Sequence, residues 1–377
     1  MVVRMARRKW GARFLSLTLC AAMLSGIFYT GEIPSLAAES VGYDDYMDLV
    51  STYALNDSIP MYKEYATAME QVFPDERIEI NAGDYIYYEE SNVEAEPEIY
   101  TDFEGMEGDS VLVTETGLIE YEFTVPVSGY YDLSVLYYPI EGKSSEIQRA
   151  FFIDGELPYG ELSLIEFSRI WSANVTESYV NADGVEVRCW IKDNQGNDLK
   201  PSSVEVPEWV ESYCYDSDGY ITDNLQIYLE EGTHTISMLS LREPMLLRQL
   251  TFSNREDVLD YASVRAQWDA QGATATSGQM IRIEAENAAR TSSQMLYPQQ
   301  DQSSPAVYPS SARELLNNSI GGSSWQSAGQ WIEWEFEVAE SGYYNISLFD
   351  KQNFVRGIFV SRRITIDGEV PFAEMSQ

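Results

Sequence analysis

The sequence offers few side chains for nucleophilic or metal chemistry. His234 is the only histidine among the 377 residues, so a Ser–His–Asp or Cys–His catalytic system would have to use it. It stands in EEGTHTISM, where a glycine turn leads into an alternating pattern, and this favours a position on a strand surface. Histidine-rich zinc sites are excluded by this count. Carboxylate chemistry is the remaining option, but no Asp or Glu pair is marked out for glycoside hydrolysis, so we expect no enzyme.

Glu284 and Glu286 lie two residues apart in IEAEN (283–287), which would place both on one side of a strand. Calcium favours clustered oxygen ligands, so the pair is a candidate calcium site. The alternative is one more acidic strand in an acidic protein. An earlier stretch, RIEINAGDY (77–85), is similar, but Asn81 takes the place of the second carboxylate there.

Tryptophans are the candidates for stacking on a sugar, because the apolar C–H face of a pyranose suits an aromatic ring at a loop edge. Trp190 and Trp209 are favoured, since Trp190 adjoins the polar loop DNQGND (193–198). The further candidates are Trp171, Trp325 and Trp331. For each of them, packing in the core is the alternative, and Trp334 is assigned to the core by its alternation.

Cysteines and recurring basic residues leave alternatives open. Cys189 and Cys214 either form a disulfide or remain buried free thiols. Lys143 and Arg149 recur 213 residues later as Arg356 and Arg362. They either pair with carboxylates of the fold or bind an acidic sugar.

The N-terminus has the pattern of a secretory signal peptide: basic residues, the apolar run FLSLTLCAAMLSGIF, and small residues at SLAAES. The run is too short for a membrane span, so we expect no transmembrane domain after cleavage, which we place after Ala37 or Ala38. Cys20 suggests a lipoprotein, but bulky Leu19 precedes it.

The charge is strongly negative. The formal net charge is −37, and removing residues 1–38, with their five basic residues and Glu32, makes it −41. Such acidity opposes binding to nucleic acid and to anionic membranes. Aromatic residues make up 13% of the chain, 26 of them Tyr, and this content excludes simple disorder.

The chain repeats one pattern. IEYEFTVPVSGYYDLSV (119–135) recurs as IEWEFEVAESGYYNISL (332–348), and IDGELPYGEL (153–162) recurs as IDGEVPFAEM (366–375), both at an offset of 213. Period-two alternation predicts strands with one buried face, and Asp-Gly predicts hairpins. A duplication of this length predicts tandem antiparallel β-sandwiches of the jelly-roll kind.

The expected organisation follows. A signal peptide covers residues 1–38, a helical lead-in 39–75, the first sandwich 76–254, a helical linker 255–280, and a second sandwich 281–377. The match to the first copy stops at residue 162 of that copy, so the second is expected to be incomplete. Its inward row Ile332, Trp334, Phe336 and Val338 should then be exposed.

The Glu-rich first strand and jelly-roll pattern resemble carbohydrate-binding modules of families 6 and 35, a galactose-binding-like fold. Three runs, EGKSSEIQRAFFIDGELP, DNQGNDLKPSSVEVPEW and NNSIGGSSWQSAGQWIEWEFEV, resemble the N-terminal region of large extracellular solute-binding proteins of Gram-positive bacteria. That resemblance covers nearly all of residues 42–377 and implies tandem modules in front of the sugar-binding lobes of an ABC importer. Modules of this kind often hold a structural calcium near the first strand.

We therefore expect a secreted, non-catalytic protein on the extracellular face of a Gram-positive cell. Its partners would be an oligo- or polysaccharide and, through a missing C-terminal domain, an ABC permease. The alternatives are an accessory region of a truncated glycoside hydrolase or polysaccharide lyase, and a structural surface spacer.

Overall fold

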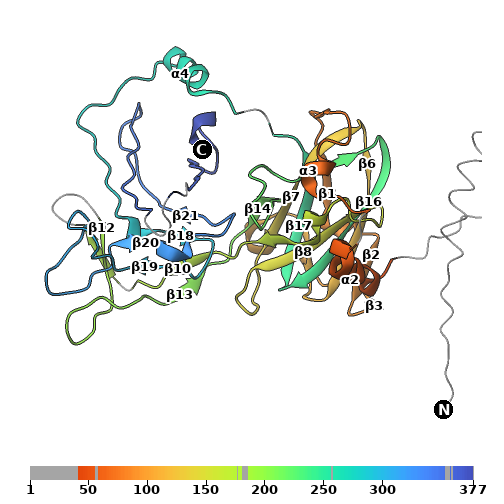
Figure 1. Cartoon of the computed structure of the whole chain (residues 1–377), viewed down its shortest axis with the longest axis horizontal. Coiled ribbons are helices and arrows are strands. Elements are labelled where there is room, and N and C mark those ends of the chain that lie inside the picture. The colour runs from red at the N-terminus through yellow and green to blue at the C-terminus, as the bar shows by residue number, and fades with distance from the viewer. Residues whose placement is uncertain are drawn as a thin grey trace, which may run out of the picture. The chain divides into compact units, whose positions relative to one another are not determined.

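The computed structural model describes residues 41–376 apart from 56–57, 176, 181–185, 256–257, 353–356 and 358–359. The expected signal peptide and Arg356 therefore lie outside the described residues. The chain from Val41 onward forms one compact unit, in which antiparallel strands dominate and helices are few and short (Figure 1). The mainly β fold expected from the alternating patterns is confirmed. Among the described residues no helix is long and apolar enough to cross a membrane.

The first copy is a sandwich of two antiparallel sheets. One sheet has six strands in the order β3-β2-β6-β16-β8-β9. These are β2 (Tyr87–Glu90), β3 (Val93–Glu94), β6 (Gly117–Val125), β8 (Ile147–Ile153), β9 (Ile165–Phe167) and β16 (Gly232–Arg242).

The other sheet has seven strands in the order β14-β7-β17-β5-β4, with β1 also on β17 and β15 also on β7. These are β1 (Ile78–Asn81), β4 (Ile99–Thr101), β5 (Asp109–Val113), β7 (Gly129–Tyr138), β14 (Val210–Tyr213), β15 (Gln226–Leu229) and β17 (Met245–Ser253). Short 3-10 turns interrupt the loops: η2 (Ala82–Asp84), η3 (Phe103–Gly105) and η4 (Gly160–Ser163).

Strand β6 shows how alternating apolar and polar residues form a strand with one buried face. Ile119, Tyr121 and Phe123 are buried, whereas Glu122 and Thr124 between and beyond them are exposed. The buried row packs against the opposite sheet, where Phe123 stacks on Phe252 with ring centroids 4.9 Å apart. The pattern therefore makes one face of the strand part of the core.

The helical lead-in consists of α2 (Tyr43–Thr52), η1 (Tyr53–Leu55) and α3 (Tyr62–Tyr65). Tyr46 of α2 is fully buried, its ring lies 4.2 Å from that of Phe152, and its hydroxyl lies 2.9 Å from Ser237 Oγ. Helix α2 thus covers the outer face of the six-stranded sheet. The lead-in is part of the folded sandwich.

The second copy contains α4 (Tyr261–Ala270) and much shorter strands. In the part of 281–376 that the structure describes, these are β18 (Arg290–Thr291), β19 (Pro298–Gln299), β20 (Ser319–Ile320) and β21 (Ile332–Glu333), with turns η5 (Ala285–Asn287), η6 (Gly322–Ser324) and η7 (Ala373–Met375). Strand β21 ends after two residues, whereas the matching line of the first copy forms seven residues of β6, 119–125. Ile332 and Trp334 are half-buried, and Phe336 and Val338 are 47% and 49% exposed.

The second copy nevertheless repeats contacts of the first. Tyr131 donates a hydrogen bond to Val127 O at 2.6 Å, and Tyr344 donates one to Glu340 O at the same distance. The Asp-Gly turns also agree, since Asp154 and Asp367 have φ of 51° and 53°. The duplication is therefore a repeat of local geometry as well as of sequence.

A long excursion of the first copy reaches the second copy. We call residues 168–209 the arm; it carries β10 (Trp171–Ala173), β11 (Glu177–Val180), β12 (Glu186–Cys189) and β13 (Ser203–Glu205). Strands β13 and β10 continue into β18 and β21 as one four-stranded sheet, in which Trp171 pairs with Thr291. The two copies thus share a sheet (Figure 1).

Candidate functional site

Trp209 belongs to an aromatic cluster with Tyr100, Phe103 and Tyr138. Its ring meets that of Tyr138 edge to face at 5.4 Å, and Phe103 meets both tyrosines edge to face at 5.4 and 5.2 Å. The indole Nε1 of Trp209 donates to Phe103 O at 3.1 Å. Tyr138 is buried, and the other three rings are half-buried. The contacts therefore hold these aromatic rings in place where β7 ends and the loop after β4 begins.

The loop that carries Phe103 has an unusual backbone. Asp102 and Glu104 have φ of 52° and 46°, in the left-handed region that non-glycine residues rarely adopt. Asp102 closes the loop, because its Oδ1 accepts from Gly108 N at 2.9 Å and its own N–H donates to Gly108 O at 3.0 Å. Strain held by such a closure is found at binding sites more often than elsewhere.

Carboxylates lie near two of these rings, and one of them, Glu208, is already paired with Arg290 at 2.9 Å. The hydrogen bond from Tyr100 to Glu98 raises the pKa of that tyrosine. Burial, followed by the charges of Glu104 and Glu208, raises the pKa of Tyr138. Acceptor oxygens beside aromatic rings are the complement of a sugar, which offers C–H faces and hydroxyl donors. Trp209 is predictable from the sequence, whereas its partners are not; the glycine-rich run DFEGMEG (102–108) is the signal available for their loop.

Trp190 is half-buried, and within the described residues it makes no hydrogen bond or ring contact. The neighbouring loop DNQGND was expected to supply polar groups beside Trp190, but its side chains bind the second copy. Asp198 N donates to Leu315 O at 2.8 Å, and Asp198 Oδ2 accepts from Asn317 N at 2.9 Å. Asn197 Oδ1 accepts from Leu315 N at 2.8 Å. The loop attaches the arm to the second copy.

Trp171 is 7% exposed and packs where the two copies share a sheet. With Glu286, Leu296, Pro298 and Ile320 it lines a small pocket that has room for about one water molecule. This volume cannot admit a sugar ring, so Trp171 is a packing residue.

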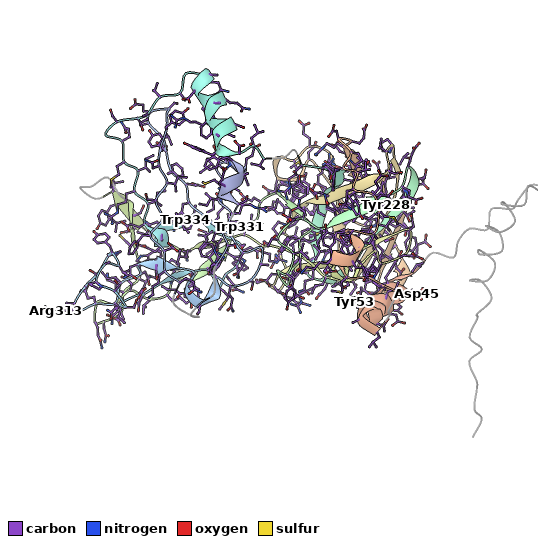
Figure 2. All side chains as sticks on the ribbon, turned by 45° about the horizontal axis from the view of Figure 1, so that its top comes forward. Asp45, Tyr53, Tyr228, Arg313, Trp331 and Trp334 are labelled. Carbon is purple, nitrogen blue, oxygen red and sulfur yellow. The ribbon has the colours of Figure 1, made fainter. Side chains whose placement is uncertain are left out.

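Trp325 and Trp331 are half-buried in the second copy. Arg362 lies over the Trp325 ring at 4.2 Å, and the indole donates to Gln330 O at 3.2 Å. Trp331 is held by its backbone N–H, which donates to Ser292 Oγ at 2.9 Å. Trp334, labelled with Trp331 in Figure 2, donates from its indole to Ala285 O at 3.0 Å.

Glu284 and Glu286 have different surroundings. Glu284 Oε1 lies 2.7 Å from the Arg282 guanidinium, as Glu79 lies 2.7 Å from Arg77 in the first copy. Glu286 is 5% exposed, its Oε2 has no partner among the described residues, and burial raises its pKa to about 8. No group of three or more His, Cys, Asp or Glu side chains suited to a metal occurs in the described part of the chain. The oxygen ligands that these two residues offer a metal are thus the unpartnered Glu286 Oε2 and the Glu284 carboxylate, which is paired with Arg282.

The possible disulfide is not formed. Cys189 is half-buried on β12, Cys214 is fully buried beyond β14, and both are free thiols. Burial raises the pKa of Cys214, so its thiol is unreactive.

The two recurring basic residues of the first copy, Lys143 and Arg149, have different surroundings. Lys143 pairs with Glu115 at 2.6 Å, as expected of a basic residue in an acidic chain. Arg149 is fully buried and finds no carboxylate within the described residues.

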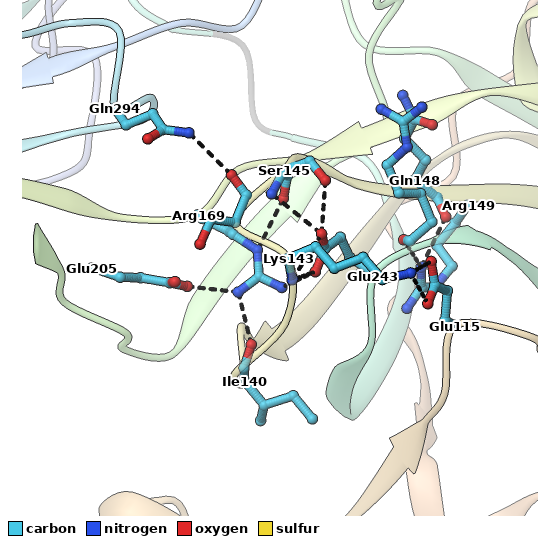
Figure 3. A network of polar contacts seen from close by, with 12 residues as sticks. Glu115, Ile140, Lys143, Ser145, Gln148, Arg149, Arg169, Glu205, Glu243 and Gln294 are labelled. Carbon is cyan, nitrogen blue, oxygen red and sulfur yellow. Dashed lines mark hydrogen bonds and ion pairs between the residues drawn. The ribbon is translucent and has the colours of Figure 1, made fainter. Parts of the chain in front are cut away.

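Arg169 and Glu243 form a buried ion pair at 2.8 Å at the base of the arm (Figure 3). Glu243 also accepts from Lys143 N and from Ser145 N and Oγ, at 2.7 to 3.2 Å. Arg169 donates further to Glu205, Ile140 O and Ser145 O. This pair fixes where the arm leaves the sandwich, and no pattern in the sequence marks it.

His234 lies on β16 opposite the buried Phe123, and its side chain is 15% exposed, which is less than expected for a position on a strand surface. Its Nδ1 is 2.7 Å from Asp154 Oδ2 and its Nε2 is 2.9 Å from Glu230 O. Burial lowers its pKa, but these acceptors outweigh burial and leave the pKa raised. Both ring nitrogens are used in these contacts.

No family model and no curated protein matches the chain. Among solved structures, a family 35 carbohydrate-binding module from Clostridium thermocellum is 13% identical, with a TM-score of 0.28, covering 48% of this chain and 99% of its own. The C-terminal family 6 module of LamC, a laminarinase of Zobellia galactanivorans, is 12% identical at a TM-score of 0.26, covering 48% and 100%. A family 26 mannanase with a family 35 module, from Podospora anserina, is 13% identical at 0.26, covering 50% and 30%. Similarities of this size assign the chain to no family.

Proposed function

We propose that this chain is a secreted, non-catalytic carbohydrate-binding protein. Its first sandwich binds an oligo- or polysaccharide at the aromatic cluster of Tyr100, Phe103, Tyr138 and Trp209. The observation that carries the proposal is this cluster at a strained loop, with the carboxylates of Glu98 and Glu104 near its rings. Rings give the apolar platform, and carboxylates accept from sugar hydroxyls.

The larger context that we propose is the front part of an extracellular solute-binding protein of an ABC sugar importer. The support is the resemblance of its three sequence runs together with the tandem repeat. Genomic sequence around the coding region separates the alternatives. Neighbouring permease genes and a following pair of βα lobes favour the importer, and an adjoining catalytic barrel or toroid favours an accessory module of a hydrolase or lyase.

Glycan-array screening of the whole chain, followed by isothermal titration, tests sugar binding. Replacing Trp209 by Ala should weaken binding about tenfold or more, since one lost stacking contact is worth about 1.4 kcal/mol. Trp268→Ala, on α4, is the matched control and should leave the affinity unchanged. Trp190→Ala reports whether the free ring of Trp190 adds a second contact. Absence of binding to any glycan would leave a structural spacer as the function.

We also propose calcium at Glu284 and Glu286. The support is the buried Glu286 Oε2, which has no partner in the described structure and lines a pocket with room for one small ligand. Calcium should raise the melting temperature of the chain relative to EDTA, and Glu286→Gln should remove that rise. Equal melting temperatures in calcium and EDTA would exclude the site.

A further inference from the structure

Arg149 is a buried cation with unused donors. It lies on β8, is fully buried, and its Nη1 donates to Gln148 O at 2.8 Å and to Arg242 O at 2.9 Å. Its Nε and Nη2 have no hydrogen-bond partner within the described residues. A buried donor without a partner is rare, because it loses its bonds to water and gains nothing in exchange.

Ser240 stands directly opposite on β16. The register pairs Ser240 with Arg149, and the neighbouring pair on the same side is Met238 with Phe151, in the core between the sheets. Residues paired in this way have Cβ atoms about 5 Å apart. Ser240 is fully buried, and its Oγ also lacks a partner in the described structure. Unused donors therefore occur on two adjacent strands, facing the same interior.

The nearby carboxylates are committed to other groups. Glu243 accepts from Lys143 N, Ser145 and Arg169, and Glu115 pairs with Lys143 (Figure 3). A guanidinium keeps its proton even when buried. An uncompensated buried charge costs several kcal/mol. The positive charge of Arg149 thus needs a negative charge that these side chains do not provide.

We propose that Arg149 and Ser240 bind a small inorganic anion, chloride or another halide, in the core of the first sandwich. The guanidinium would donate from Nε and Nη2, and the serine from its hydroxyl. A halide accepts from several donors without offering a proton, and it neutralises the buried charge. A water molecule could accept the same hydrogen bonds, but it would leave that charge uncompensated.

Thermal unfolding of the whole chain in sodium chloride and in sodium gluconate, at equal ionic strength, tests the proposal. Chloride above its dissociation constant should raise the melting temperature by about 3 °C for each tenfold increase in concentration. Ser240→Ala, which removes one donor and keeps the charge, should increase the half-saturating chloride concentration about tenfold. Arg149→Gln should abolish the chloride effect.

Crystals grown with bromide provide a direct readout. An anomalous peak beside Arg149 and Ser240 supports the proposal. Identical melting in chloride and gluconate, together with density for water and no anomalous peak, would overturn it. The Ser240→Ala variant keeps the test decisive even where Arg149→Gln fails to fold.

Discussion

Glu374 accepts a hydrogen bond from the backbone N–H of Tyr261 at 2.9 Å, and so repeats in the second copy the bond from Tyr62 N–H to Glu161 at 2.8 Å. In both copies a carboxylate of the sandwich region caps the first turn of the preceding helix. The ring of Tyr261 also meets Phe372 as Tyr62 meets Tyr159, at 4.9 and 5.1 Å. Helix α4 therefore makes the same contacts with the second copy as α3 makes with the first.

Glu161→Gln and Glu374→Gln should each destabilise the chain, because a neutral amide is a weaker acceptor at a helix N-terminus. We expect a loss of about 1 kcal/mol for Glu161, which is half-buried, and less for exposed Glu374. Urea unfolding measures both. The exposed Glu231→Gln is the control, and equal, negligible effects of all three variants would show that the caps do not contribute.

The buried pair of Arg169 and Glu243 should be sensitive to loss of one partner. Glu243→Ala leaves Arg169 buried without its charge partner, and Arg169→Ala leaves Glu243 in the same state. Each should cost about 3–5 kcal/mol in the free energy of unfolding. The double variant should cost less than the sum of the two, which a double-mutant cycle measures. Strict additivity would show that the two charges do not stabilise one another.

His234 should make stability depend on pH. Both ring nitrogens face acceptors, and only the imidazolium can donate to both. A folded-state pKa raised above the unfolded value gives a contribution that is present below about pH 6.5 and is lost as pH rises through the folded pKa. The destabilisation caused by His234→Gln should thus be larger at pH 5.5 than at pH 8, as measured by urea unfolding. A difference that does not change with pH would contradict the assignment.

Residues 39–254 should unfold cooperatively, whereas residues 281–377 expressed alone should not. The second fragment lacks the arm strands that continue its sheet, and Phe336 and Phe349 are already 47% and 77% exposed. Thermal unfolding with a dye that binds apolar surface compares the two fragments. A sharp, reversible transition of residues 281–377 without dye binding would contradict this domain boundary.

Local pattern was enough to predict the longer strands of the first copy, but not the short strands β10 to β13 of the arm. Ile119, Tyr121 and Phe123 alternate with polar residues, and Asp154-Gly155 fixes the following hairpin, so both features depend on neighbours in sequence. The same line gives only two strand residues at Ile332–Glu333. A strand also needs a partner for its backbone groups, and that partner is not encoded in the line itself.

The candidate site was harder to predict than the strands, because it too depends on residues far apart in the sequence. Trp209 could be named from its residue type, but Tyr100 and Phe103 reach it from a strand and loop about one hundred residues earlier. The polar loop at 193–198 resembled a ligand site because its composition cannot show whether its acceptors are already occupied. Asp198 is occupied by Asn317, a residue of the other copy.

The arm has a consequence for how such repeats can be exchanged by recombination. A crossover between residues 254 and 255 would look harmless in sequence, since it falls between the copies. It would separate Arg188 from Ala288 O, and Glu208 from Arg290, which are bonded at 2.9 Å in each case. Each copy would then carry an arm fitted to a neighbour that it no longer has. A recombined chain that keeps these contacts must therefore receive the arm and the segment that it binds from the same parent.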